Sequence, residues 1–253
     1  MNKESFYIYG KKPIEEQLLR NPENILRIFI SDKMADLYGG VKDLREKAKE
    51  HRIPVNPVTK QKIKEYVGDV NDQGVIALIK RAEYQDFDEW IETLNIEDNP
   101  AVLVLDHIED IHNFGALVRT AAAVGVAGVI VAKDRQAPIN AISYKTSAGT
   151  IVKVPIVRVS NINHSIEKLK KSRFWIAAVD MDEEGLSQPL WKHSLHDSPM
   201  AFVLGGEGKG VSEKTREHSD YILSIPMENN VESLNVSVAA AVVLYEWKRQ
   251  QNL

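Results

Sequence analysis

Near its end the chain reads Ser233-Leu234-Asn235-Val236-Ser237-Val238-Ala239, shortly after the tripeptide Ile225-Pro226-Met227. Serine and asparagine are good N-terminal caps, so the stretch predicts a final helix over 236–250. The preceding residues 221–225 form a short apolar run, which is typical of a buried strand. A strand, a turn and a capped helix in this order indicate an alternating α/β fold.

The same alternation continues upstream of this stretch. Short apolar runs that read as buried strands lie at 102–105, 128–132, 174–179 and 200–204. Helices are predicted over 114–124, where Gly125 ends the run, and over 162–171 and 211–218. This pattern predicts a mainly parallel sheet with helices on both faces.

The N-terminal third reads as a separate, small α/β unit over residues 1–82. Proline suits the first turn of a helix, so a helix is expected from Lys12-Pro13 to about residue 19. Strands are predicted over 25–30 and 75–79, with a charged helix over 41–51 between them. Residues 83–99 turn acidic and polar, which indicates a linker with one amphipathic turn around Phe87 and Trp90. The second domain is predicted over 100–253.

The composition is that of an ordinary globular protein. The 253 residues are 43% hydrophobic and 27% charged, and none is cysteine. No apolar run approaches ~18 residues and the N-terminus has no apolar stretch, so neither a membrane span nor a signal peptide is expected. The lack of cysteine excludes disulfides and cysteine nucleophiles and fits a cytoplasmic location. The scattered histidines have no metal-ligand spacing, so no metal is predicted.

The charge is unevenly distributed along the chain. Residues 1–81 carry 16 Lys and Arg against 12 Asp and Glu, whereas residues 82–253 carry 16 against 24. The N-terminal part is therefore the better candidate for contacting the phosphates of a nucleic acid. Scattered, solvated lysines are the alternative explanation of this small excess.

Three stretches, taken together and in order, resemble a known family. They are 113–121 (NFGALVRTA), 204–208 (LGGEG) and the C-terminal block 225–239. They resemble the three motifs of the SpoU family of RNA ribose 2′-O-methyltransferases, within the knotted SPOUT class. The match covers roughly residues 99–253, and the N-terminal third resembles the family's L30e-like RNA-binding domain. The resemblance implies a deep C-terminal trefoil knot, S-adenosylmethionine as methyl donor, and a homodimer through the knotted region whose active sites draw on both chains.

The glycine pair Gly205-Gly206 directly follows a predicted strand. Glycine lets backbone approach a ligand closely, and ligands of open α/β sheets bind at the carboxyl ends of strands. Tight turns alone would also explain the glycines. A Walker A phosphate loop is excluded, because position 203 is valine and glycine follows Lys209. By resemblance, S-adenosylmethionine is bound by Leu204, Gly205, Gly206, Ile225, Met227 and Leu234.

The resemblance also implies a catalytic set, which consists of Asn113, Arg119, Glu207, Ser233 and Asn235. Arg119 lies off the apolar stripe of its helix, where it could simply be solvated. A guanidinium is not expected to deprotonate, so stabilising a developing alkoxide or binding a phosphate is an alternative to the role of general base. Glu207 is a rival base. Ser233 and Asn235 could instead serve only as helix caps.

The overall layout resembles the enzymes of this family that methylate a guanosine of large-subunit ribosomal RNA. A transfer-RNA guanosine-18-type methyltransferase is the alternative within the class, although basic helical extensions typical of that group are not seen. A non-catalytic RNA-binding protein on the same fold is an alternative from another class. A protein that only binds RNA has no need of all five residues of the catalytic set, so their presence argues against this alternative.

Overall fold

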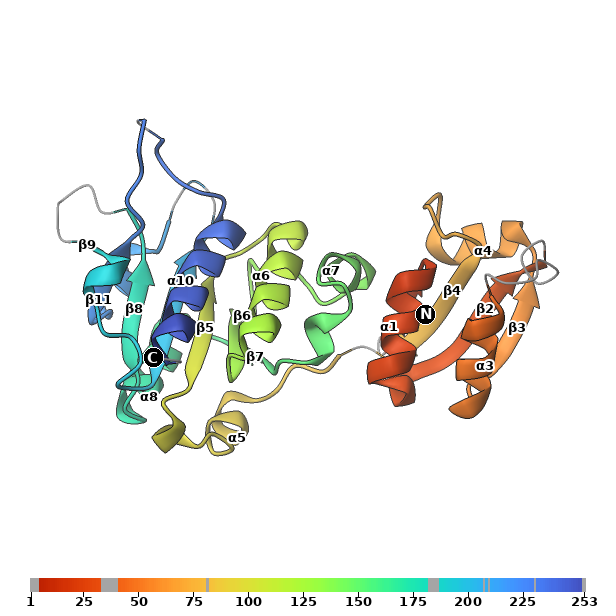
Figure 1. Ribbon diagram of the computed structural model, residues 1–253, viewed down its shortest axis with the longest axis horizontal. Helices are drawn as coiled ribbons and strands as arrows, with labels where there is room; N and C mark the ends of the chain where they lie inside the picture. Colours follow the sequence, from red (N-terminus) through yellow and green to blue (C-terminus); the bar gives the residue numbers. More distant parts are fainter. Residues whose placement is uncertain are drawn as a thin grey trace. The chain divides into compact units, whose positions relative to one another are not determined.

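The computed structural model describes residues 5–32, 41–80, 82–181, 187–206, 208, 210–229 and 231–251, and they form two compact units (Figure 1). The N-terminal unit comprises the described residues of 1–82 together with those of 139–152. The C-terminal unit comprises the described residues of 83–138 and 153–253. The chain therefore leaves the C-terminal unit after residue 138 and returns to it at residue 153.

The C-terminal unit is built on a sheet of seven parallel strands in the order β7-β6-β5-β10-β8-β11-β9. The strands are β5 (Ala101–Asp106), β6 (Gly128–Ala132), β7 (Ile156–Val159), β8 (Trp175–Val179), β9 (Gln188–Pro189), β10 (Met200–Gly205) and β11 (Tyr221–Ser224). The predicted α/β class with a parallel sheet is confirmed. The edge strands β7 and β9 were not predicted, because each is short and carries polar residues or proline.

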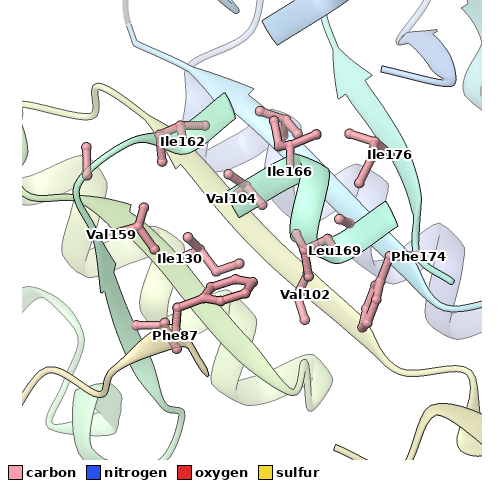
Figure 2. Packing of buried hydrophobic residues seen from close by; sticks show 14 of the residues in the cluster. Phe87, Val102, Val104, Ile130, Val159, Ile162, Ile166, Leu169, Phe174 and Ile176 are labelled. Atoms are coloured by element: carbon pink, nitrogen blue, oxygen red, sulfur yellow. The ribbon is translucent and has the colours of Figure 1, made fainter. Parts of the chain in front are cut away.

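Apolar side chains alternate between the two faces of this sheet. Val102 and Val104 of β5 point to the face covered by α8 (Ile162–Lys171) and by α5 (Phe87–Ile91). Figure 2 shows Ile162, Ile166 and Leu169 of α8 packed over these strands. A helix that buries one apolar stripe in this way stabilises the sheet mainly by removing apolar area from water.

Residues 83–99 pack against this core. Trp90 is 2% exposed, and its indole nitrogen donates a hydrogen bond to the Ala127 carbonyl at 3.3 Å. A Cβ atom on Gly128 would lie 2.6 Å from the Trp90 ring, so glycine leaves the space that the indole fills. Gln85 forms an isolated parallel bridge with Val157. The predicted amphipathic turn around Phe87 and Trp90 thus belongs to the C-terminal unit.

The opposite face is covered by α6 (Ile111–Val124) and α10 (Val236–Gln251), which lie side by side (Figure 1). Short helices α9 (Glu213–Glu217), η2 (Ile96–Asp98) and η4 (Leu190–Lys192) complete the unit. No helix in the described part of the chain is long and apolar enough to cross a membrane.

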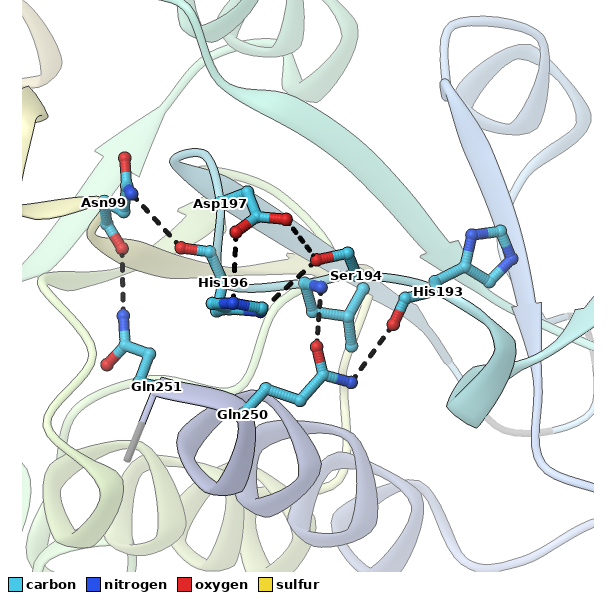
Figure 3. Close-up of polar contacts among 8 residues, drawn as sticks. Asn99, His193, Ser194, His196, Asp197, Gln250 and Gln251 are labelled. Carbon is cyan, nitrogen blue, oxygen red and sulfur yellow. Dashed lines mark hydrogen bonds and ion pairs between the residues drawn. The ribbon is translucent and has the colours of Figure 1, made fainter. Parts of the chain in front are cut away.

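Polar contacts fasten the end of α10 to a neighbouring loop (Figure 3). The Gln250 side chain accepts a hydrogen bond from the Leu195 amide at 2.7 Å and donates one to the His193 carbonyl at 3.1 Å. Glu246, one turn earlier, accepts hydrogen bonds from Arg249 and Gln250, which lower its pKa to about 2. These contacts fix the helix whose first turn carries the residues of the third motif.

The N-terminal unit holds a four-stranded sheet in the order β1-β4-β2-β3, in which only β2 and β3 are parallel. The strands are β1 (Ser5–Tyr9), β2 (Ile25–Ser31), β3 (Val55–Val58) and β4 (Val75–Lys80). The helices are α1 (Lys11–Arg20), η1 (Pro22–Asn24), α3 (Lys42–Glu50) and α4 (Lys60–Val67). The expected strands and helices are present, and β1, η1, β3 and α4 are additional.

Residues 139–152 complete the N-terminal unit with α7 (Ala141–Thr146) and η3 (Thr150–Val152). A capping box formed by Asn140 and Ser143 begins α7. Tyr144 is 2% exposed, and its ring meets that of Phe6 on β1 edge to face at 5.1 Å. Its buried hydroxyl has no hydrogen-bond partner among the described residues, and burial raises the pKa of this phenol.

Tyr144→Phe is expected to stabilise the protein by about 1 kcal/mol, because it removes a buried, unsatisfied hydroxyl while keeping the ring. Chemical denaturation of the two proteins measures the difference. Tyr245 is 54% exposed, so Tyr245→Phe is a control expected to stay within roughly ±0.5 kcal/mol. A clear loss of stability in Tyr144→Phe would contradict the unsatisfied hydroxyl.

Candidate functional site

The carboxyl ends of the neighbouring strands β10, β8 and β11 open onto one cavity of about 830 Å³, which we name the donor cavity. This is the edge at which parallel sheets bind ligands. The cavity is lined by all six residues that the resemblance assigns to the methyl donor: Leu204, Gly205, Gly206, Ile225, Met227 and Leu234. Ser233 and Asn235 of the predicted catalytic set line it too.

Backbone forms much of the wall at the end of β10. A Cβ atom on Gly205 would lie 1.8 Å from the Gly210 carbonyl oxygen, and one on Gly206 would lie 2.5 Å from the His107 carbonyl oxygen. Gly206 and Gly210 form an antiparallel bridge, and Gly210 has a φ of 62°. The chain after β10 therefore turns back on itself in a way that only glycine allows.

A second cavity of about 470 Å³ adjoins the first, and we name it the acceptor cavity. Three residues, Gly206, Gly210 and Val236, line both cavities. The remaining lining residues come from the end of β5, the loop to α6, the first turn of α6, the loop after β6 and the segment before α9: Asp106, His107, Ile108, Glu109, Asp110, Asn113, Arg135 and Ser212.

A hydrogen bond joins the first and third motifs across these cavities. The Asn235 amide nitrogen donates to the Asn113 amide oxygen at 3.0 Å. Asn235 also caps α10, because its side-chain oxygen accepts from the Ser237 amide at 2.9 Å. The helix that was expected from residue 114 begins at Ile111, and Asp110 caps it by accepting from the Asn113 amide at 2.8 Å. The Asn113 side chain is therefore not needed as the cap and reaches Asn235.

The other predicted catalytic residues are placed differently. Arg119 lies on α6 and is exposed, and it lines neither cavity. Ser233 is exposed at the rim of the donor cavity, two residues before the cap of α10. Glu207 lies outside the described residues. Within one chain, the structure thus brings Asn113, Ser233 and Asn235 together and leaves Arg119 apart.

Two groups in the cavity walls were not predicted from the sequence, and the first is a buried carboxylate. Asp106 ends β5 and is 2% exposed. Its Oδ2 accepts hydrogen bonds from the Ser212 amide at 3.2 Å and from the Thr215 hydroxyl at 3.1 Å. Its Oδ1 lies 2.5 Å from Nδ1 of His107. The position at the end of a strand was the only sequence signal for this group.

The second group lies at the end of β8. Asp180 lines the donor cavity, and its Oδ2 lies 3.9 Å from a guanidinium nitrogen of Arg216. A Cβ atom on Gly210 would lie 2.9 Å from Oδ1 of Asp180, so the glycine loop packs closely against this carboxylate. Asp180 therefore gives the donor cavity an acidic group opposite the glycines. Across the described residues, no group of three or more histidine and acidic side chains is arranged to hold a metal ion.

Comparison with known proteins covers nearly the whole chain. Residues 100–245 match the SpoU rRNA methylase family, and residues 7–85 match the family described as RNA 2′-O ribose methyltransferase substrate binding. A 23S rRNA (guanosine-2′-O-)-methyltransferase, RlmB of Neisseria meningitidis, is 36% identical over 247 residues, which are 97% of this chain and 96% of the relative.

Solved structures share the fold. An rRNA methyltransferase from Sinorhizobium meliloti with bound AdoMet is 20% identical with a TM-score of 0.78, covering 97% of this chain and 87% of that one. The TrmH/SpoU tRNA modifying enzyme of A. aeolicus is 31% identical with a TM-score of 0.56, over 66% of this chain and 82% of that one. The predicted enzyme class, an RNA methyltransferase, is confirmed by the family matches. The chain belongs to the SpoU rRNA methylase family.

Proposed function

We propose that the protein transfers a methyl group from S-adenosylmethionine to the ribose 2′-hydroxyl of a guanosine in 23S rRNA. The observation that carries this proposal is the pair of adjoining cavities at the carboxyl ends of the sheet, joined by the Asn113–Asn235 hydrogen bond. The similarity to the Neisseria enzyme, along almost the full length of both chains, supports guanosine and 23S rRNA.

The larger cavity receives the methyl donor in this proposal. S-adenosylmethionine, when bound, supplies a methyl group activated by a positive sulfonium. The side-chain-free wall at Gly205 and Gly206 lets backbone groups approach that ligand, and the apolar side chains of Ile225, Met227 and Leu234 surround it. Asp180 offers a carboxylate that suits the hydroxyl groups or the positive charge of the donor.

The acceptor cavity takes the target nucleotide. The positive end of the α10 dipole favours an anion, so a phosphate next to the target ribose would lie near Ser233 and Asn235. Asn113 holds the Asn235 amide and thereby orients it. Glu207 is retained in the proposed catalytic set as a residue that orients the substrate or neighbouring polar side chains.

Arg119 acts in this scheme by its charge. A guanidinium is not expected to lose its proton, and it binds phosphate or a developing alkoxide through a planar fork of donors. Because Arg119 lines neither cavity of its own chain, we propose that it completes the site of a partner subunit.

A homodimer through the knotted domain follows from this role of Arg119. Val238 and Tyr245 of α10 are 48% and 54% exposed, so this helix also presents apolar side chains away from its own core. A helix that is apolar on more than its core face is typical of one covered on both sides. The trefoil knot stays a prediction of the resemblance.

The N-terminal domain captures RNA in this proposal. By function, the proposed division is residues 1–82 for RNA binding, 83–99 for the linker and 100–253 for the methyltransferase domain. Residues 139–152 pack with the first of these segments and residues 83–99 pack with the last. The lysine and arginine excess of residues 1–81 suits phosphate contacts. Because the proposed substrate is ribosomal RNA, we also propose a cytoplasmic location.

Two alternatives predict different results in one experiment. A guanosine-18-type tRNA methyltransferase would modify tRNA, as the similarity to the A. aeolicus enzyme allows. A non-catalytic RNA-binding protein would modify no RNA. Mapping ribose methylation in total RNA from cells with and without the gene decides among them. A single 23S guanosine that loses its methyl group supports the proposal, and a change confined to tRNA would contradict it.

Gly205→Ala is expected to weaken S-adenosylmethionine binding at least tenfold, because a Cβ atom would lie 1.8 Å from the Gly210 carbonyl oxygen and force the loop to move. Calorimetry measures the affinity, and thermal unfolding shows whether the rest of the chain stays folded. Gly125 ends α6 in the left-handed region, which asparagine tolerates, and has open space around it, so Gly125→Asn is the control and should bind the donor normally. Unchanged affinity in Gly205→Ala would show that the methyl donor binds elsewhere.

Arg119→Ala is expected to reduce kcat by about 10²–10³ and to leave donor affinity unchanged, because it removes a charge that acts in the transition state. Its effect on the stability of the folded chain should be within roughly ±0.5 kcal/mol, since the side chain is exposed. Arg173, exposed before β8 at the opposite end of the sheet, provides the control Arg173→Ala, with turnover like the wild type.

The second variant, Arg119→Lys, separates the two possible roles of the arginine. A charge-stabilising role predicts a weak enzyme with the pH profile of the wild type, because lysine keeps the charge but loses the planar fork. A rate that climbs steeply towards the pKa of the amine would instead identify a base at this position.

A further inference from the structure

Asp106 and His107 form an acid–imidazole pair that the proposed set of catalytic residues does not use. Asp106 is 2% exposed, and Nδ1 of His107 lies 2.5 Å from its Oδ1. The other oxygen of the carboxylate is held by Ser212 and Thr215, which fix its position. An ionised carboxylate only accepts hydrogen bonds, so Nδ1 of His107 carries the proton and Nε2 is left as an acceptor.

The backbone of His107 lies in the left-handed region. Its φ is 64°, where a residue with a Cβ atom costs roughly 1–2 kcal/mol relative to glycine. The tight approach of Gly206 to the His107 carbonyl shows that this turn is packed closely against the glycine loop. An imidazole kept in such a conformation and held by a buried carboxylate suggests a functional rather than a packing role.

His107 also lies where the proposed reaction needs a proton acceptor. Its side chain is 34% exposed and lines the acceptor cavity. That cavity shares Gly206, Gly210 and Val236 with the donor cavity, so a ribose placed between them meets both the methyl donor and this imidazole. Arg119 lines neither cavity, and a guanidinium is a poor base.

We infer that His107, oriented by Asp106, is the residue that accepts the proton of the ribose 2′-hydroxyl. The inference rests on the proposed function and names its proton acceptor. As the ribose oxygen forms its bond to the methyl carbon, the carbon–sulfur bond breaks and its electron pair stays on sulfur, which becomes a neutral thioether. The hydroxyl proton passes to Nε2 of His107, and the imidazolium that forms is stabilised by the negative charge of Asp106.

Charged side chains line the acceptor cavity around His107. Asp106 on β5 and Glu109 and Asp110 in the following loop contribute negative charge, and Arg135 from the loop after β6 contributes positive charge.

Two variants test the inference with the full-length protein and its 23S rRNA substrate. His107→Gly suits the positive φ but leaves Oδ1 of Asp106 without its histidine partner, so thermal unfolding is used to show that the variant is folded at the assay temperature. Its kcat should fall on the order of 10², the low end for loss of a general base, with S-adenosylmethionine affinity unchanged by calorimetry. Added imidazole should restore the rate, because it can enter the space that the side chain leaves and accept the proton.

His107→Asn is the matched second variant. Asparagine tolerates the left-handed backbone and can still donate a hydrogen bond to Asp106, but it supplies no base. It should lose as much activity as His107→Gly and should not respond to imidazole, because its side chain fills the space. A purely structural role of His107 predicts the opposite, with near-normal turnover in His107→Asn and no rescue of His107→Gly.

A measurement without catalysis checks the geometry. In the ¹⁵N spectrum of the histidine side chains, neutral His107 should be the tautomer with its proton on Nδ1. A proton on Nε2, or wild-type kcat in His107→Gly, would overturn the inference while leaving the proposed function intact. A wild-type protein that folds and binds the donor but methylates no RNA would overturn both.

Discussion

No side chain fits at residue 205 or 206, because the chain leaving β10 folds back against the backbone of Gly210 and His107. Much of the site depends on this close approach. It makes one loop the common wall of the donor and acceptor cavities. It also brings the segment before α9 next to β5, where Ser212 and Thr215 hold the buried carboxylate of Asp106. Backbone geometry, rather than a single side chain, therefore determines where both substrates would lie.

The sequence predicted the elements that form strong apolar runs and left out those that do not. The apolar runs of β5, β6 and β10 clearly indicate a buried sheet. Ile156–Val159 includes the exposed Arg158, and α7 is short and rich in polar residues, so neither has a clear period. Phe87 and Trp90 were recognised as one apolar turn, but only packing against β6 shows what that turn buries.

Only those site residues that belong to the three sequence motifs could be predicted. The donor cavity contains all six residues named for the donor, because the motifs follow strands whose ends meet in a parallel sheet. The Asn113–Asn235 hydrogen bond spans 122 positions, and no local pattern encodes it. The contact between Asp106 and His107 could not be predicted either, because it depends on a positive φ at His107 that the residue types do not indicate.

Because residues 139–152 belong to the N-terminal unit, the two units do not simply follow one another along the chain. The chain crosses between its two units three times, after residues 82, 138 and 152. A fragment that begins at residue 83 would keep Tyr144 and Ile151 but lose β1 and the other elements that bury them. Such a fragment would present fresh apolar surface and be prone to aggregation. The N-terminal unit is thus not a detachable module, and its exchange between relatives requires two matched segments rather than one.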